Sequence, residues 1–134
     1  MAQPPLILAV DDNDHDLYLI RQVFGLLRPS CRVETFNDSR SLITFLRQSD
    51  QLPSLILVDW HMPDLDGIQV VEEVRRSPRL FPVPVFLLSS DLNPTGHFKA
   101  LDNGATGFLI KPANFTEWNQ LVERLAFSFL DDQV

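Results

Sequence analysis

Cysteine and lysine are both scarce in this sequence. Its 134 residues contain one cysteine, Cys31, and two lysines, Lys99 and Lys111. A single cysteine cannot form a disulfide within the chain, and this favours a reducing compartment such as the cytoplasm. The other positive charges are scattered arginines, and the net charge is −7. The chain therefore lacks the clustered positive charge with which proteins bind nucleic acids or anionic membranes, and we expect neither partner.

Long apolar segments are absent as well. No apolar run approaches the roughly 18 residues that a membrane span needs. The first ten residues, MAQPPLILAV, lack the basic region and the long apolar stretch of a signal peptide. The chain contains no low-complexity linker, and its length fits one domain. We predict that residues 1–134 form a single domain with no separate output domain.

The sequence does contain a regular alternation of short apolar runs and amphipathic segments. The runs predict strands at Leu6–Val10, Arg32–Phe36, Leu55–Val58, Val83–Leu88 and Gly107–Ile110. Helical periodicity predicts helices at Asp14–Leu27, Ser39–Gln48, Gly67–Arg76, Asn93–Asn103 and Asn114–Phe129. Nearly continuous apolar runs are typical of parallel strands that are buried on both faces. The pattern predicts an α/β fold, a doubly wound, flavodoxin-like sandwich around a five-stranded parallel sheet of order 2-1-3-4-5.

In this strand order the ligand crevice lies at the carboxyl ends of the first and third strands. The first strand is followed by Asp11 and Asp12, and the third by Asp59. Three close carboxylates repel one another, and a hard cation such as Mg²⁺ would relieve the repulsion. The two adjacent acids suit a metal ion, whereas Asp59 stands alone and is the better candidate nucleophile.

The two remaining strand ends add other chemistry to the same crevice. The fourth strand ends at Ser89, and Lys111 follows the fifth strand. A metal ion, a hydroxyl donor, an ammonium group and a carboxylate nucleophile are the groups that handle a phosphoryl group. Taken singly, each acid could simply form a turn or cap a helix, and the lysine could lie at the surface. Their joint placement at four strand ends favours the phosphoryl site.

These residues resemble the receiver domain of bacterial two-component response regulators. The resemblance rests on 6-LILAVDDN-13, 57-LVDWHMPDLDG-67, 85-VFLLSS-90 and 104-GATGFLIKP-112, and it extends over essentially the whole chain. It implies that Asp59 is the phosphoacceptor. It also implies that Asp12 binds Mg²⁺ directly, that Asp11 acts largely through water, and that the backbone carbonyl of His61 is a further ligand. The His61 side chain is expected to face solvent.

The resemblance also assigns the phosphoryl contacts and the conformational switch. Ser89 and Lys111 would contact the phosphoryl group, and Phe108 would turn inward together with Ser89 after phosphorylation. The Lys111–Pro112 bond is expected to be cis, as it commonly is in the family. The donor would be a sensor histidine kinase or a histidine phosphotransfer protein. A downstream protein would bind the surface formed by the fourth helix, the fifth strand and the fifth helix.

Two finer predictions concern relatives and assembly. The segment Pro82-Val83-Pro84 and the aromatic last helix resemble the small stand-alone receivers that serve phytochrome-type histidine kinases. Phe127 falls opposite the apolar stripe of that helix, with Leu130 to one side. Exposed apolar side chains can mark a contact surface, and we predict a homodimer through the same switch surface.

Two other functions remain open at this stage. One is a phosphatase with an aspartate nucleophile, although Asp59 is followed by Trp60-His61 and lacks the D-x-D pattern usual in such enzymes. The other is a receiver-like adaptor that binds partners without being phosphorylated, which has no need for all five polar site residues. We favour a phosphoacceptor that is not a turnover enzyme.

Overall fold

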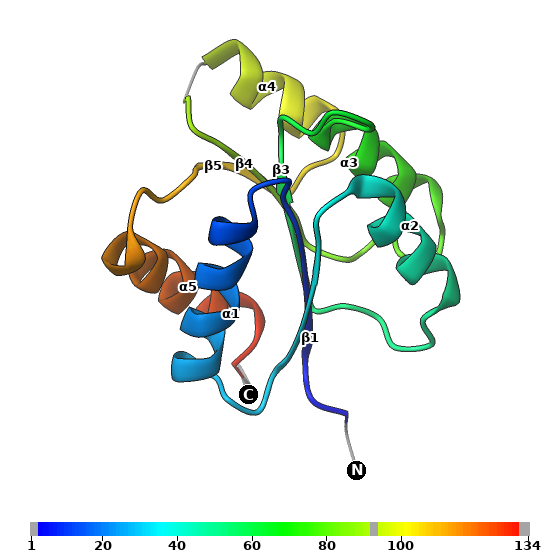
Figure 1. Cartoon of the computed structure of the whole chain (residues 1–134). Coiled ribbons are helices and arrows are strands. Elements are labelled where there is room, and N and C mark those ends of the chain that lie inside the picture. The colour runs from blue at the N-terminus through cyan, green and yellow to red at the C-terminus, as the bar shows by residue number, and fades with distance from the viewer. Residues whose placement is uncertain (1–2, 92–93, 132–134) are drawn as a thin grey trace.

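A parallel sheet with helices on both faces forms the centre of the molecule (Figure 1). The structure is a computed structural model, and it describes residues 3–91 and 94–131. Its strands are β1 (Leu6–Val10), β2 (Arg32–Phe36), β3 (Leu55–Asp59), β4 (Val85–Ser89) and β5 (Gly107–Ile110). They are all parallel and lie in the order β2-β1-β3-β4-β5. The predicted fold class and strand order are confirmed.

The helices connect these strands and cover the two faces of the sheet. They are α1 (Asp14–Leu27), α2 (Ser39–Gln48), α3 (Gly67–Arg76), α4 (Pro94–Asp102) and α5 (Phe115–Phe129). Helices α1 and α5 pack side by side on one face, and α2 and α3 cover the other (Figure 1). Among the described residues, none of the helices combines the length and the hydropathy that a membrane span requires.

Two apolar layers hold the helices to the sheet. Successive side chains of a strand point to opposite faces. Leu8 and Ile56 therefore contribute to the layer under α2, α3 and α4, while Ile7 and Leu57 contribute to the layer under α1 and α5. This alternation explains why the strands have continuous apolar sequences, because both faces of each central strand are buried.

Several element boundaries differ from the predictions by one or two residues, among them the ends of β3 and α4. Strand β4 begins at Val85 and not at Val83, because Pro84 has no N–H and the Val83 N–H donates to Leu80 O at 3.0 Å in the preceding turn. Helix α5 begins after its N-cap, Asn114. Phe115 is 42% exposed and does not join the apolar stripe of α5. Asn93, the predicted first residue of the fourth helix, lies outside the described residues.

The chain after β3 turns back tightly against the sheet. Gly67 begins α3, and a Cβ at this position would lie 2.4 Å from Leu87 Cδ2 and 2.9 Å from the Trp60 Cα. The Gly67 N–H donates to Trp60 O at 2.8 Å. Asp66 caps α3 in a reciprocal arrangement with Gln69. Only glycine fits this close approach without displacing the loop that follows Asp59.

Candidate functional site

Three carboxylates gather at the carboxyl edge of the sheet, as predicted. Asp11 follows β1 and Asp59 is the last residue of β3, and both are buried, whereas Asp12 is exposed. One ligand oxygen from each of the three carboxylates lies within 4.8 Å of the others. This separation suits three oxygen ligands that share one divalent cation.

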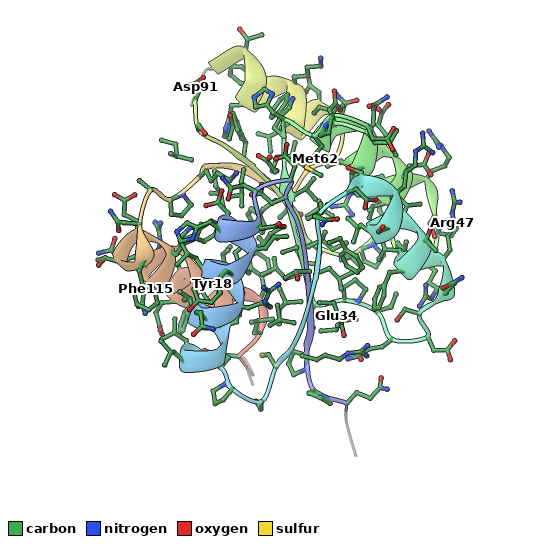
Figure 2. The ribbon with its side chains drawn as sticks, viewed as in Figure 1. Tyr18, Glu34, Arg47, Met62, Asp91 and Phe115 are labelled. Carbon is green, nitrogen blue, oxygen red and sulfur yellow. The ribbon has the colours of Figure 1, made fainter. Side chains whose placement is uncertain are left out.

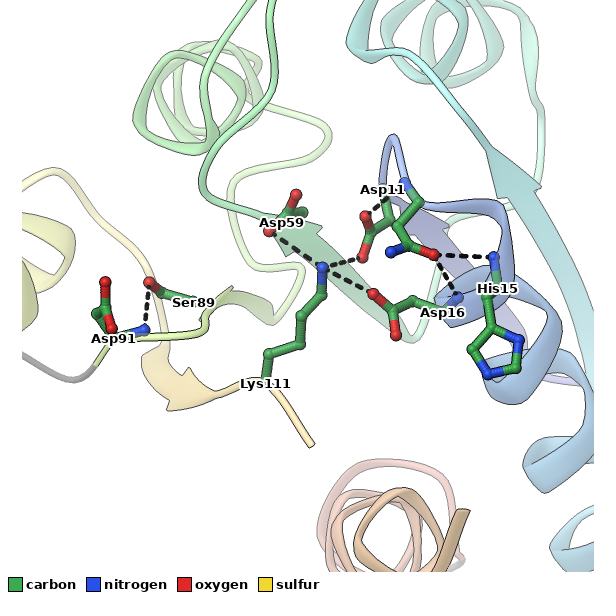
Figure 3. A network of polar contacts seen from close by, with 8 residues as sticks. Asp11, His15, Asp16, Asp59, Ser89, Asp91 and Lys111 are labelled. Atoms are coloured by element: carbon green, nitrogen blue, oxygen red, sulfur yellow. Dashed lines mark hydrogen bonds and ion pairs between the residues drawn. The ribbon is translucent and has the colours of Figure 1, made fainter. Parts of the chain in front are cut away.

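A lysine ammonium lies among these acids (Figure 3). Lys111 Nζ lies 2.7 Å from Asp11 Oδ2, 2.9 Å from Asp16 Oδ2 and 3.6 Å from Asp59 Oδ1. The backbone places the lysine there, because the Lys111 N–H donates to Ser89 O at 2.7 Å directly after β5. The site therefore contains a fourth acid, Asp16, which the pattern of strand ends does not predict.

Burial makes the charged forms of these groups unfavourable. Burial and, next, the charge of Asp11 raise the pKa of Asp59 to about 6, against the opposing effect of Lys111. Burial also raises the pKa of Asp11, although the nearby Lys111 ammonium and a hydrogen bond from the Asn13 N–H act to lower it. Burial acts to lower the pKa of Lys111, but its contacts with Asp11 and Asp16 outweigh burial and raise it. A bound cation would favour the ionised carboxylates, so this acid set fits a metal ion.

The loops that follow the strands place the remaining site residues. Figure 2 shows Met62 and Asp91, which lie in the loops after β3 and β4, at the same end of the molecule. Ser89 is buried at the end of β4, and its Oγ accepts a hydrogen bond from the Asp91 N–H at 3.2 Å. The His61 side chain is exposed, as expected.

A cluster of three aromatic rings connects the loop after β3 to α4. The rings of Trp60 and Phe108 meet edge to face with centroids 5.2 Å apart, and the His97 ring lies 5.9 Å from that of Phe108. Phe108 is only 6% exposed and is already inside the protein in this structure. No sequence pattern indicates this contact, because the three residues come from separate segments.

One backbone prediction was wrong. No peptide bond among the described residues is cis, so the Lys111–Pro112 bond is trans. The trans form of an X-Pro bond is intrinsically favoured by about 0.5–1 kcal/mol, and the trans bond accommodates the contacts of Lys111 described above.

Comparison with known proteins identifies the family. The model of the response regulator receiver domain matches residues 7–124. The chain is a response regulator receiver domain. Receiver domains are typically phosphorylated on an aspartate, bind Mg²⁺ in the acidic pocket and interact with histidine kinases and downstream targets.

Two curated proteins illustrate how widely receiver domains of this kind occur. The probable methanogenesis regulatory protein FilR2 of Methanothrix harundinacea is 31% identical over 126 residues, which are 91% of this chain and 81% of FilR2. The two-component response regulator ORR11 of Oryza sativa subsp. indica is 34% identical over 122 residues, with the same two coverages.

Among solved structures, the receiver is similar to the phosphorylated cyanobacterial phytochrome response regulator RcpA. The TM-score is 0.87 and the identity 28%, over 96% of this chain and 95% of RcpA. The predicted resemblance to the receivers of phytochrome systems is thus matched by a structural neighbour of that kind.

Proposed function

We propose that Asp59 accepts a phosphoryl group in a Mg²⁺-dependent reaction and that the surface of α4, β5 and α5 then signals to a partner. One observation carries this proposal. Asp59 is buried with the carboxylates of Asp11 and Asp12 close enough to share a cation, and the Lys111 ammonium lies 3.6 Å away. The phosphorylated form of RcpA supports the same chemistry in a similar protein.

Asp11, Asp12 and Asp59 would hold Mg²⁺ in this proposal, together with the backbone carbonyl of His61. When bound, Mg²⁺ would neutralise charge on the oxygens of the transferred phosphoryl group. The raised pKa of Asp59 and of Asp11 supports this assignment, because a cation favours the ionised form of each acid.

The proposed transfer exchanges one bond to phosphorus for another. An oxygen of the Asp59 carboxylate bonds to the phosphorus while the phosphorus–nitrogen bond of the donor phosphohistidine breaks. The donor ring, already protonated on its other nitrogen, keeps the electron pair of the broken bond and leaves as neutral imidazole. Lys111 donates a hydrogen bond to one phosphoryl oxygen. The Ser89 O–H donates a hydrogen bond to another, while the Ser89 oxygen accepts one from the Asp91 N–H. The phosphoryl group stays on Asp59, so the protein assists its own phosphorylation and dephosphorylation without being a turnover enzyme.

The proposed donor is a sensor histidine kinase or a histidine phosphotransfer protein in the cytoplasm, and the proposed target is another protein. Phe108 supports a route to the signalling surface, because it contacts both Trp60, next to Asp59, and His97 on α4. In this proposal Ser89 and Phe108 form the switch, with Phe108 adjusting its packing from an already buried position.

Intact mass after incubation with Mg²⁺ and either acetyl phosphate or phosphoramidate tests the chemistry. We expect the wild type to gain one phosphoryl group and to lose this reactivity when EDTA is added. Asp59→Asn should gain nothing. Asp64→Asn is the matched control, because Asp64 is an exposed acid in the following loop that pairs with Arg40, and it should react like the wild type.

Other outcomes of the same experiment select the rival functions. A phosphoryl gain on Asp59→Asn would move the nucleophile to another residue. Continuous release of phosphate from small phosphomonoesters would favour a phosphatase. No gain from either donor, together with no response of Trp60 fluorescence to beryllofluoride, would favour an adaptor that is not phosphorylated.

The surface of α4, β5 and α5 is also the proposed homodimer interface. A groove of about 430 Å³ between β5 and α5 is lined in part by Ile110, Gln120 and Arg124. Phe127 is exposed and follows Gln120 and Arg124 at helical spacing, whereas Leu130 is partly buried against the core. Sedimentation should show a dimer with beryllofluoride that Phe127→Glu disrupts. A wild type that stays monomeric at high concentration would contradict the dimer.

A further inference from the structure

Lys111 has a second carboxylate partner that the proposed chemistry does not use. Asp16 lies in the first turn of α1, and its Oδ2 is 2.9 Å from Lys111 Nζ. Asp11 contacts the same ammonium at 2.7 Å, but the distance to Asp59 is 3.6 Å, which is too long for a good hydrogen bond. The ammonium therefore forms its two short ion pairs with Asp11 and Asp16 and lies farther from Asp59.

The backbone around α1 fixes Asp16 in this position. Asn13, the N-cap of α1, accepts a hydrogen bond from the Asp16 N–H at 3.2 Å and donates its own N–H to Asp11 Oδ1 at 2.9 Å. This arrangement connects Asp16 to the end of β1, where the acid cluster begins. Asn13 therefore links the backbone of Asp16 to the side chain of Asp11.

The location of Asp16 has an ordinary explanation that does not account for its contacts. An acid in the first turn of a helix is favoured by the helix dipole whatever its side chain touches. Asp14 occupies the same turn and is exposed. The side chain of Asp16 is only 14% exposed, and it reaches a lysine side chain that is 13% exposed. The dipole explains the residue type, and the contact with Lys111 requires a separate reason.

We propose that Asp16 is a positioning residue that holds Lys111 back from Asp59 and competes with the phosphoryl group for the lysine ammonium. This inference rests on the proposed function of Asp59. Asp16 lies outside the trio of Asp11, Asp12 and Asp59 that could share a cation. A cation bound to the trio would attract the Asp11 carboxylate and weaken its ion pair with Lys111. Asp16 would keep its ion pair with the ammonium. The protein thereby limits how strongly Lys111 binds the phosphoryl group.

The proposal predicts opposite effects on two ligands. Removing the charge of Asp16 frees the ammonium for an anion on Asp59, so the anion binds more tightly. It also removes one negative charge near the cation site, so Mg²⁺ alone binds more weakly. Charges a few Å apart in a partly buried site change a binding constant by on the order of tenfold. A variant that merely disturbs the structure would weaken both ligands.

Isothermal titration calorimetry on the whole chain can measure both affinities, for Mg²⁺ alone and for beryllofluoride at saturating Mg²⁺. We expect Asp16→Asn to bind beryllofluoride on the order of tenfold more tightly and Mg²⁺ alone more weakly. Asp16→Glu keeps the charge and should restore both affinities towards the wild type. Asp14→Asn removes a charge from the same turn without a contact to Lys111, and it should change each affinity less than about twofold.

A second pair of variants tests whether Asp16 acts through the lysine. In a Lys111→Met background, Asp16→Asn should no longer tighten beryllofluoride binding. Equal tightening in both backgrounds would show that the charge acts at a distance, and the positioning role would be wrong.

The outcomes also separate this inference from the proposed function. If the wild type binds beryllofluoride and Asp16→Asn binds it no more tightly, the role of Asp16 is overturned while that of Asp59 stands. If the wild type does not bind beryllofluoride at all, the proposed function fails and the role of Asp16 fails with it.

Discussion

The apolar layers on either side of the sheet and the acidic crevice at its carboxyl edge are both buried, yet burial has opposite consequences in the two regions. In the layers, Leu8 and Ile56 are fully buried, and removing such side chains from water stabilises the fold. In the crevice, burial raises the pKa of Asp11 and of Asp59. Ionised acids held there destabilise the fold, because their charges are removed from water.

The comparison shows how one strand serves both purposes. Residues Leu55–Val58 of β3 belong to the apolar layers, and the next residue, Asp59, belongs to the crevice. The packing of the strand fixes the backbone that holds Asp59 beside Asp11. The free energy gained by burying the apolar layers therefore offsets the repulsion between the acids that the fold holds together.

The largest expected effect concerns the apolar layers. Leu8→Ala removes a fully buried side chain from the central strand β1, and we expect the free energy of unfolding to fall by about 3 kcal/mol. Urea denaturation at pH 7.5 measures the change. A loss below about 1 kcal/mol would mean that the layer collapses around the cavity, and the contrast with the crevice would weaken.

A change in the crevice should act in the opposite direction. Folding raises the pKa of Asp59 from 3.8 to about 6, so the folded state favours the protonated acid. The contribution of Asp59 to stability is therefore present below about pH 4 and is lost as the pH rises through about 6. We expect Asp59→Asn to raise the free energy of unfolding by roughly 2 kcal/mol at pH 7.5 in EDTA, and by almost nothing at pH 4.

Urea denaturation at both pH values, with Asp64→Asn as the exposed control, measures the effect of Asp59. The control should differ from the wild type by less than about 0.5 kcal/mol at either pH. If Asp59→Asn is less stable than the wild type at pH 7.5, the ionised carboxylate stabilises the fold and the contrast between the two regions is wrong.

The smallest effect should come from a polar atom within an apolar layer. Trp118 is fully buried, and its Nε1 has no hydrogen-bond partner among the described residues. Trp118→Phe removes this donor but also some apolar volume, and the two effects oppose each other. We expect the free energy of unfolding to stay within about 1 kcal/mol of the wild type, measured by urea denaturation. A loss above about 2 kcal/mol would indicate that a buried water satisfies the indole N–H.

Much of the fold could be predicted because its elements carry local signals. Apolar runs of strand length alternate with helical periodicity, and only one strand order is common for that pattern. The predictions fail where contacts with neighbouring segments, and not the local sequence, determine the structure. Val83 has a suitable sequence for a strand, but the turn from Leu80 uses its N–H. Phe115 matches the helical stripe by spacing, but it lies in the first turn of α5, where the side chain projects beyond the core.

The candidate site was predictable to the extent that strand ends determine it. Asp11, Asp12 and Asp59 gather because parallel strands place their carboxyl ends at one edge. Asp16 was missed because its partner, Lys111, comes from the other end of the chain, and an acid in the first turn of a helix is common for other reasons. The prediction of a cis Lys111–Pro112 bond was wrong. It came from the family resemblance, and the residues themselves carry no signal for the isomer.

The enclosure of Lys111 has a practical consequence for labelling the protein. Reagents that acylate amines attack the neutral form of an exposed amine, and Lys111 is largely buried with a raised pKa. The other lysine, Lys99, is exposed on α4. Of the two lysines, an amine-reactive dye will therefore modify Lys99 and leave the lysine of the crevice unmodified. A fluorescent reporter can thus be placed on the proposed signalling surface of the natural sequence, with no engineered cysteine.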